Sequence, residues 1–318
     1  MLVLLAGAVL LLGGVWLSVT QPVLPVKRGL EAPAVEPARL EAHVRMLSGT
    51  LSPRDPAHPE GMDAAARYIR GELEGAGAAV SEQAFDVGGR TYRNVVAAFG
   101  PEGGERVVVG AHYDAAGPLP GADDNASGVA GLIELARLLA KSRPAPRVEL
   151  VAYALEEPPF FRTRHMGSAV HARSLREQGA RVRAMISLEM IGYFSDREGS
   201  QQFPSPLLKV AYPTRGDFIC VVGKMDQGAL VRRVKRAMLG AAPLPVYSIN
   251  APRAIPGIDF SDHANYWDAG YDAVMVTDTA FFRNPHYHTQ GDTHDTLDYG
   301  RMALVVRGVY EAVQNLSR

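Results

Sequence analysis

From about residue 38 onward, apolar residues follow two different spacings along the chain. Segment 61–77 ("GMDAAARYIRGELEGAG") places them three or four residues apart, which predicts a helix with one buried face. Segment 106–112 ("RVVVGAH") is a short, nearly continuous apolar run, which predicts a strand buried on both faces of a sheet. Because segments of the two kinds alternate, the sequence indicates an α/β domain with a largely parallel sheet.

The same reading extends over the rest of the chain. The further predicted helices cover residues 40–50, 127–142, 165–178, 228–239 and 297–316, and the further predicted strands cover residues 92–99, 147–155, 181–190, 218–223 and 271–278. No second linker-like boundary follows residue 40, so we expect one domain over residues 38–318. Its predicted architecture has three layers, with a central, mostly parallel mixed sheet flanked by helices.

The amino-terminal residues differ from this pattern. Residues 2–19 form an uncharged apolar stretch just long enough to cross a bilayer. We interpret residues 1–20 as a hydrophobic transmembrane helix that anchors the chain. A secretory signal peptide is the alternative, although the stretch has neither a basic n-region nor an A-x-A cleavage site. Residues 21–37 contain four prolines and predict a linker.

This interpretation places the folded domain on a membrane or in the secreted fraction, outside the cytoplasm. Lys27 and Arg28 are weak evidence for the opposite orientation.

Composition excludes several classes of protein. The 318 residues are 47% hydrophobic and 21% charged, which is typical of a globular chain. A net charge of -1 and a pI near 6.8 lack the basic excess of nucleic-acid-binding proteins. The single cysteine, Cys220, allows neither an intrachain disulfide nor a zinc site built from cysteines.

Acidic and histidine side chains follow the predicted strands at their carboxyl ends. In an open α/β sheet these ends are where ligands usually bind. The strand ends carry His112 with Asp114, Glu156 with Glu157, and Glu189, while two loops add Asp123 with Asp124 and His286 with His288. Taken singly, each is more often a structural residue, such as a helix cap in "DDNASG". Taken together, they predict a functional site.

The charges of these residues indicate what the site holds. Two histidines and at least three carboxylates would repel and desolvate one another unless a cation lay among them. Imidazole nitrogen and carboxylate oxygen form a ligand set that zinc accepts, with manganese or cobalt as substitutes. Five ligands exceed the usual three of one catalytic zinc, so we expect two zinc ions bridged by one carboxylate.

The neighbouring residues Glu156 and Glu157 end one predicted strand and are followed by "PPFF". Successive side chains of a strand point in opposite directions, so the two glutamates need not do the same task. One can bind metal while the other takes a proton from water, in a pocket walled by Phe160 and Phe161. The alternative is a pair of solvated acids at the start of a loop, which these apolar neighbours disfavour.

The ordered motifs "GAHYDA", "PGADDNASG", "EE", "LEMIGY", "SDH" and "YHTQGDT" resemble the co-catalytic di-zinc exopeptidases, which include bacterial secreted aminopeptidases and glutamate carboxypeptidases. The resemblance covers roughly residues 85–315 and implies the zinc-exopeptidase fold. It implies that His112, Asp124 and Glu189 bind one zinc and that Asp124, Glu157 and His288 bind the other, with Asp124 as the bridge.

The resemblance also implies roles around the metals. Glu156 matches the general base, and Asp114 matches a carboxylate that orients His112. Tyr287 matches a tyrosine that stabilises the oxyanion in some members. Asp262 and His263 match a motif near the site, where a structural role is at least as well supported.

The expected activity is that of a zinc-dependent exopeptidase acting on a peptide or small amide. An aminopeptidase is the first interpretation. The alternatives are a carboxypeptidase or amidohydrolase, in which Arg162 or Arg164 would bind a substrate carboxylate, a glutaminyl cyclase, and a non-enzymatic receptor-like protein. The segment "EEPPFFRTRHMGS" lacks the family's glycine-rich run, so Phe160, Phe161 and Arg162 would form a substrate wall particular to this chain. The oligomeric state stays open.

Overall fold

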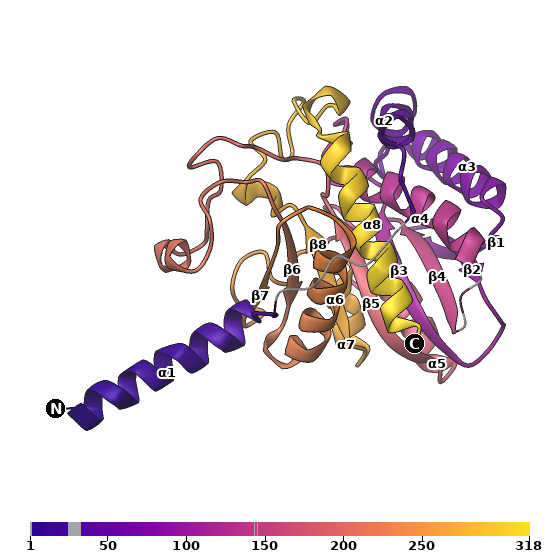
Figure 1. Ribbon diagram of the computed structural model, residues 1–318. Coiled ribbons are helices and arrows are strands. Elements are labelled where there is room, and N and C mark those ends of the chain that lie inside the picture. Colours follow the sequence, from indigo (N-terminus) through magenta and orange to yellow (C-terminus); the bar gives the residue numbers. More distant parts are fainter. Residues whose placement is uncertain (1, 25–32, 143, 145) are drawn as a thin grey trace.

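The computed structural model describes residues 2–24, 33–142, 144 and 146–318. A mixed eight-stranded sheet forms its centre, in the order β1-β2-β4-β3-β5-β8-β6-β7, and helices pack on both faces (Figure 1). The strands are β1 (Ala79–Val87), β2 (Arg90–Phe99), β3 (Glu105–His112), β4 (Arg147–Tyr153), β5 (Arg181–Glu189), β6 (Ile219–Gly223), β7 (Val246–Asn250) and β8 (Ala273–Thr277).

Parallel pairing is concentrated in the middle of the sheet. β4, β3, β5 and β8 are parallel neighbours, whereas β1 and β2 form an antiparallel hairpin beside β4, and β6 pairs antiparallel with β8. The carboxyl ends of β4, β3 and β5 therefore meet at one edge. The single α/β domain with a mixed sheet, as expected from the sequence, is confirmed.

The helices are α1 (Leu2–Thr20), α2 (Pro37–Arg45), α3 (Pro59–Gly75), α4 (Gly128–Ser142), α5 (Gly167–Glu177), α6 (Gly228–Ala241), α7 (His263–Asp268) and α8 (Tyr299–Leu316). All of them except α1 form the two outer layers. Buried residues of α2, α3, α4, α6 and α8 pack in one cluster against one face of the sheet. Buried residues of α5 and α7 pack in a second cluster on the opposite face.

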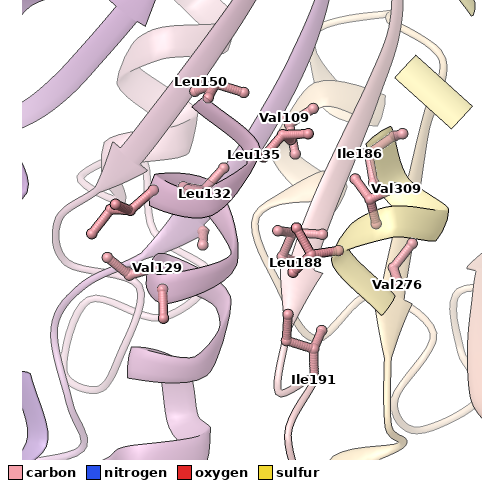
Figure 2. Close-up of a cluster of buried hydrophobic side chains, with 14 of the residues drawn as sticks. Val109, Val129, Leu132, Leu135, Leu150, Ile186, Leu188, Ile191, Val276 and Val309 are labelled. Atoms are coloured by element: carbon pink, nitrogen blue, oxygen red, sulfur yellow. The ribbon is translucent and has the colours of Figure 1, made fainter. Parts of the chain in front are cut away.

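The apolar run of β3 shows why the sheet is buried on both sides. Val107 and Val109 belong to the first cluster, and Val108 belongs to the second. Because successive side chains of a strand alternate between faces, a continuous run of valines serves both cores. Figure 2 shows Val109 in the first core together with Leu132 and Leu135 of α4 and Val309 of α8.

Two strands and one helix were not predicted. β1 ("AVSEQAFDV") is an edge strand whose residues are partly or fully exposed, so it lacks the apolar run that marks the central strands. β7 ("VYSIN") is as short as β6 and β8 but lacks their continuous apolar run, and the 6 residues of α7 are too few for a clear periodic pattern. The turn between β1 and β2 carries Gly88 and Gly89, both with positive φ, and this Gly-Gly pair is the hairpin signal that the sequence did offer.

The amino-terminal helix α1 projects away from the sheet (Figure 1). Its carboxyl end is held by Lys235, whose Nζ donates to the carbonyl oxygens of Thr20 at 3.1 Å and Gln21 at 3.2 Å. No helix within the described ranges is long and apolar enough to cross a bilayer, and the membrane anchor stays a prediction. Residues 25–32 of the predicted linker lie outside the described residues, and its boundaries stay predictions.

Gly110 of β3 provides a test of the second core. A Cβ atom at this position would overlap the ring of Tyr153, whose hydroxyl pairs with that of Tyr266 at 2.7 Å. We predict that Gly110→Ala lowers the free energy of unfolding by about 1–3 kcal/mol because the packed ring has to move.

Gly71→Ala is the matched control, since a Cβ there meets nothing within 4 Å inside α3. It should leave stability unchanged or raise it by up to about 1 kcal/mol. Denaturant unfolding measures both changes, and a Gly110→Ala protein as stable as the control would contradict the packing described here.

Candidate metal centre

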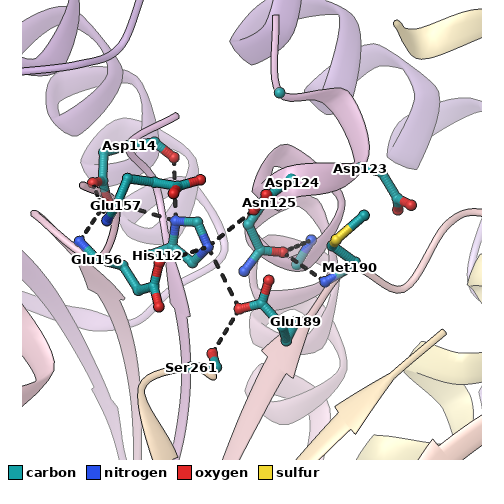
Figure 3. A network of polar contacts seen from close by, with 12 residues as sticks. His112, Asp114, Asp123, Asp124, Asn125, Glu156, Glu157, Glu189, Met190 and Ser261 are labelled. Atoms are coloured by element: carbon teal, nitrogen blue, oxygen red, sulfur yellow. Dashed lines mark hydrogen bonds and ion pairs between the residues drawn. The ribbon is translucent and has the colours of Figure 1, made fainter. Parts of the chain in front are cut away.

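Three neighbouring strands deliver the candidate residues to one edge of the sheet. His112 is the last residue of β3 and pairs in register with Tyr153, the last residue of β4. Glu156 and Glu157 follow β4, and Glu189 ends β5 on the other side of β3. Figure 3 shows the side chains of these residues gathered at the carboxyl ends of the strands, as the sequence predicts.

The loop before α4 places Asp124 opposite His112. Its conformation is held by Asn125, whose side-chain nitrogen donates to the carbonyl oxygen of Leu188 at 2.8 Å. The side-chain oxygen of Asn125 accepts hydrogen bonds from the amides of Gly128 at 3.1 Å and Met190 at 3.2 Å. Asn125 therefore links the loop to the end of β5. Residues 125–127 ("NAS") also match the acceptor sequence for glycosylation, but the buried side chain of Asn125 excludes this modification in the folded protein.

Two triads share Asp124. In the first, Nε2 of His112 lies 3.3 Å from Oδ1 of Asp124 and 3.5 Å from Oε2 of Glu189. In the second, Nε2 of His288 lies 3.0 Å from Oδ2 of Asp124 and 3.2 Å from Oε1 of Glu157. Within each triad the candidate ligand atoms lie within 4.8 Å of one another. The five residues expected from the sequence as ligands thus come together, with the two oxygens of Asp124 facing different histidines.

A third group overlaps the first triad. His112, Glu156 and Glu157 also bring candidate ligand atoms within 4.8 Å of one another. Oε2 of Glu156 lies 3.9 Å from Nε2 of His112, farther than the oxygens of Asp124 and Glu189. The distances therefore indicate that Glu156 is a neighbour of the two triads and not a member of either.

The nitrogen and oxygen atoms of the two triads are suited to bind divalent metal ions. Nε2 of His112 and Oε1 of Glu157 are buried and have no hydrogen-bond partner among the described residues. Leaving such polar atoms unpaired is costly, and coordination to a cation removes the cost. The set contains two imidazoles and three carboxylates, which is the chemistry that zinc accepts.

Burial strongly perturbs the charges of the cluster. It raises the pKa of Glu156 well above its usual value and that of Glu157 to about 8, with neighbouring carboxylates adding to the shift. Burial opposes protonation of His288, yet its close contacts with the carboxylates of Asp124 and Glu157 outweigh this and raise its pKa to about 10. In the protein without metal, bound protons therefore neutralise part of the negative charge of the cluster, and a cation would take their place.

Asp114 supports both His112 and the paired glutamates. Its Oδ1 lies 3.6 Å from Nδ1 of His112, consistent with the predicted orienting role. Its two carboxylate oxygens also accept hydrogen bonds from the amides of Glu156 at 3.1 Å and Glu157 at 3.0 Å. The sequence did not predict this second contact, which fixes the direction in which the glutamates leave β4.

Other supporting residues were missed by the sequence analysis. Ser261 donates to Oε2 of Glu189 at 2.6 Å (Figure 3). Asp292 accepts hydrogen bonds from the amides of Asp123 at 2.9 Å and Asp124 at 3.1 Å. Both residues lie in motifs that the sequence singled out, "SDH" and "QGDT", but a motif does not state which of its members reach the site.

Some candidates lie outside the triads. Asp123 accepts from the amide of Gly192 at 3.0 Å and from the side chain of Asn284 at 2.9 Å, which makes it a structural link between loops. His286 packs edge-on against Tyr193. Both side-chain oxygens of Asp262 are buried without a hydrogen-bond partner among the described residues.

An apolar cavity with a volume of about 100 Å³ adjoins the metal centre. Glu189 and Tyr287 lie where the cavity meets the centre, and the ring of Tyr287 stacks on that of His288 with centroids 3.9 Å apart. The other lining residues include Phe218, Cys220, Val222, Ile249, Ile258, Phe260, Met275, Phe281 and Phe282. A hydrophobic side chain would fit this cavity.

The predicted substrate wall lies on a rim beside the cavity. Phe161 packs edge-on against Phe260, with centroids 5.8 Å apart. The guanidinium of Arg162 lies over the ring of Phe260, 4.7 Å from its centroid, and forms an ion pair with Asp259. Phe160 packs against Tyr92 on β2. Arg162 therefore already has a carboxylate partner from its own chain.

Comparison with known proteins now identifies the family. Residues 94–313 match the model of peptidase family M28. The chain belongs to this family. The match includes all five residues of the two triads together with Asp114, Glu156 and Tyr287, and the peptidase family resemblance inferred from the motifs is thereby confirmed.

This M28 peptidase has curated relatives of different lengths. It is 50% identical over 287 residues to the uncharacterized protein YfbL of Escherichia coli, covering 88% of each chain. It is 27% identical over 210 residues to leucine aminopeptidase 1 of Coccidioides posadasii, covering 62% of this chain and 48% of the relative. The M28 peptidase thus spans about half the length of that fungal relative.

Solved structures share the fold. The LapA aminopeptidase of Legionella pneumophila superposes with a TM-score of 0.70 at 21% identity, covering 89% of this chain and 72% of LapA. A glutaminyl cyclase of Bacteroides thetaiotaomicron gives 0.68 at 22% identity, covering 90% of this chain and 99% of the cyclase. Both likenesses show that the chain shares the fold of these two proteins.

The raised pKa values predict how the metal-free protein responds to pH. Burial raises the pKa of Glu157 to about 8 and those of Asp262 and Asp292 to about 7. Each group binds its proton more tightly in the folded chain, so stability present near pH 4 is lost as the pH rises through these values.

Thermal unfolding of chelator-treated protein should therefore show a midpoint that falls between about pH 5 and pH 8. Added zinc should recover most of the loss at the upper end of this range, because the cation replaces the protons. A metal-free midpoint that is constant or rises over the same range would contradict the charge assignment.

Proposed function

We propose that this M28 peptidase is a zinc-dependent aminopeptidase that removes apolar residues from the amino terminus of peptides. The proposal rests on one observation above all, which is the pair of triads that share Asp124 beside an apolar cavity. His112, Asp124 and Glu189 would hold one zinc ion, and Asp124, Glu157 and His288 would hold the second. Manganese or cobalt are the substitutes that the same ligands would accept.

Glu156 is the proposed general base. Zinc bound by the triads would supply a Lewis acid that polarises the scissile carbonyl and lowers the pKa of water. Glu156 lies 3.9 Å from Nε2 of His112, and its buried position raises its pKa well above the usual value. A carboxyl group with such a pKa can take a proton from the attacking water and later donate it to the leaving amine. Tyr287, which lines the cavity and stacks on His288, is placed to donate a hydrogen bond to the developing oxyanion.

The cavity supports an apolar substrate side chain at the cleaved position. Most of its lining is aliphatic or aromatic, and Glu189 and Tyr287 connect it to the triads. A bound amino-terminal residue would bury its side chain there while its scissile carbonyl faced Glu156. The names of the fungal relatives and of LapA agree with an aminopeptidase.

The alternatives are supported less well. A carboxypeptidase needs a cation for the substrate carboxylate, and Arg162 is already paired with Asp259 and stacked on Phe260. A glutaminyl cyclase is the second candidate, because a cyclase structure matches over 99% of its own length. That reaction releases ammonia without the addition of water, so it has less need of the second triad and of an activated water.

Variants of Glu156 and Asp124 separate the base from the ligands. Glu156→Gln should keep the metal content of the wild type while kcat falls by about 10²–10⁴, because the proton acceptor is lost. Asp124→Ala should lose metal as well as activity, because both triads lose their shared carboxylate. Metal content and kcat are measured on the same preparations.

Glu177→Gln is the control, since Glu177 is exposed at the end of α5 and should keep both properties. Equal metal loss in Glu156→Gln and Asp124→Ala would instead assign Glu156 to the third group of ligands, with His112 and Glu157.

Substrate preference tests the cavity. Leucine and phenylalanine anilides should be cleaved with a kcat/KM at least about 10-fold higher than lysine or glutamate anilides, because only the apolar side chains fit without an unpaired charge. Blocking the amino group of the leucine substrate should abolish cleavage. Cleavage confined to blocked substrates, or ammonia release from glutaminyl peptides without a cut, would replace the aminopeptidase by one of the alternatives.

A further inference from the structure

Arg54 is a charged residue buried completely beside the metal centre. It has 0% exposure and lies between the π-helical turn Met46–Thr50 and helix α3. This part of the chain precedes residues 94–313, which match the family model. Nothing in the motif analysis or in the family match assigns it a role.

The guanidinium of Arg54 donates to main-chain carbonyl oxygens of three separate segments. Nε donates to Tyr113 at 2.9 Å, and Nη2 donates to Gly121 at 2.9 Å. Nη1 donates both to Pro120 at 2.8 Å and to Leu47 at 2.6 Å. The carbonyl oxygen of Arg54 itself accepts from the amide of Ala115 at 2.9 Å.

These partners lie next to the candidate ligands. Tyr113 stands between the ligand His112 and its supporting carboxylate Asp114. Pro120 and Gly121 begin the turn that continues into Asp123 and Asp124, and Asp124 belongs to both triads. One planar side chain therefore connects the segment after β3 with the loop before α4, at the two places where these segments turn into the site.

Burial without a close carboxylate partner would ordinarily disfavour this charge. Burial lowers the pKa of Arg54 to about 10, while the charges of Asp292, Asp114, Asp124 and Glu157 oppose the shift. The guanidinium therefore stays protonated at neutral pH, and its positive charge interacts with the carboxylates of the site. Only a guanidinium presents donors in a rigid fork that can reach several carbonyls at once, so lysine would not replace it.

We propose that Arg54 is a positioning residue of the metal centre, which fixes the segments carrying His112 and Asp124 at the separation that the bridged pair of ions requires. The amino-terminal segment before β1 is thereby an integral part of the site. The inference rests on the proposed metal centre, and its test measures metal affinity apart from peptidase activity.

The experiment compares zinc affinity, by competition with a chromogenic chelator, in wild type, Arg54→Ala and Arg54→Lys. Arg54→Ala should bind zinc about 10–100-fold more weakly, which is typical for loss of an outer-shell partner. Sub-denaturing guanidinium should restore part of the affinity by occupying the vacated position. Arg54→Lys keeps the charge but not the fork, so it should also bind more weakly than wild type.

Arg106→Ala is the control for general destabilisation. Arg106 lies near the opposite end of β3, and its Nη1 pairs with Glu149 at 2.8 Å. This variant should lose stability while keeping its zinc affinity, and guanidinium should have no effect on its zinc affinity. An equal loss of affinity in Arg106→Ala would assign the effect to destabilisation and overturn the proposal.

Two further outcomes are decisive. A folded Arg54→Ala protein with wild-type zinc affinity overturns the positioning role and leaves the proposed peptidase function standing. If Arg54→Ala does not fold, Arg54→Lys decides the question in the same way, with weakened affinity in support and unchanged affinity against. Wild-type protein that binds no zinc would instead contradict the proposed function itself.

Discussion

The buried carboxylates around His112 and His288 are the feature on which the rest of the site depends. Glu156, Glu157 and Asp124 lie at one edge of the sheet with little access to solvent. Loss of hydration and repulsion from neighbouring carboxylates oppose ionisation of the two glutamates, as their raised pKa values show. A fold retains such an arrangement when another interaction compensates for its energetic cost. The two triads that share Asp124 indicate that divalent cations provide this interaction.

The fold positions these residues by simple means. Three parallel strands end at the same edge, so the residues at their carboxyl ends meet directly, while loops add Asp124 and His288. The loops are then fixed by hydrogen bonds to main-chain groups, through Asn125 and Asp292 on one side and Asp114 on the other. Arg54 adds a connection behind the site. Rigid support of this kind matters because metal ligands tolerate little displacement.

Much of the fold and of the site could be predicted from the sequence. The central strands are apolar on both faces, so they can be recognised in the sequence as continuous apolar runs. The candidate ligands lie at or directly after the ends of these strands. β1 could not be predicted in the same way, because an exposed edge strand has no apolar run. Ser261 and Arg54 were missed because their roles arise from three-dimensional contacts, and no spacing in the sequence indicates them.

Metal stoichiometry tests the central claim most directly. The folded, active protein, purified without chelators, is analysed by elemental mass spectrometry against its protein concentration. The two triads predict two equivalents of zinc or a substituting divalent metal per chain, with loss of activity when the metal is removed. Full activity in a protein that carries no divalent metal would contradict the account.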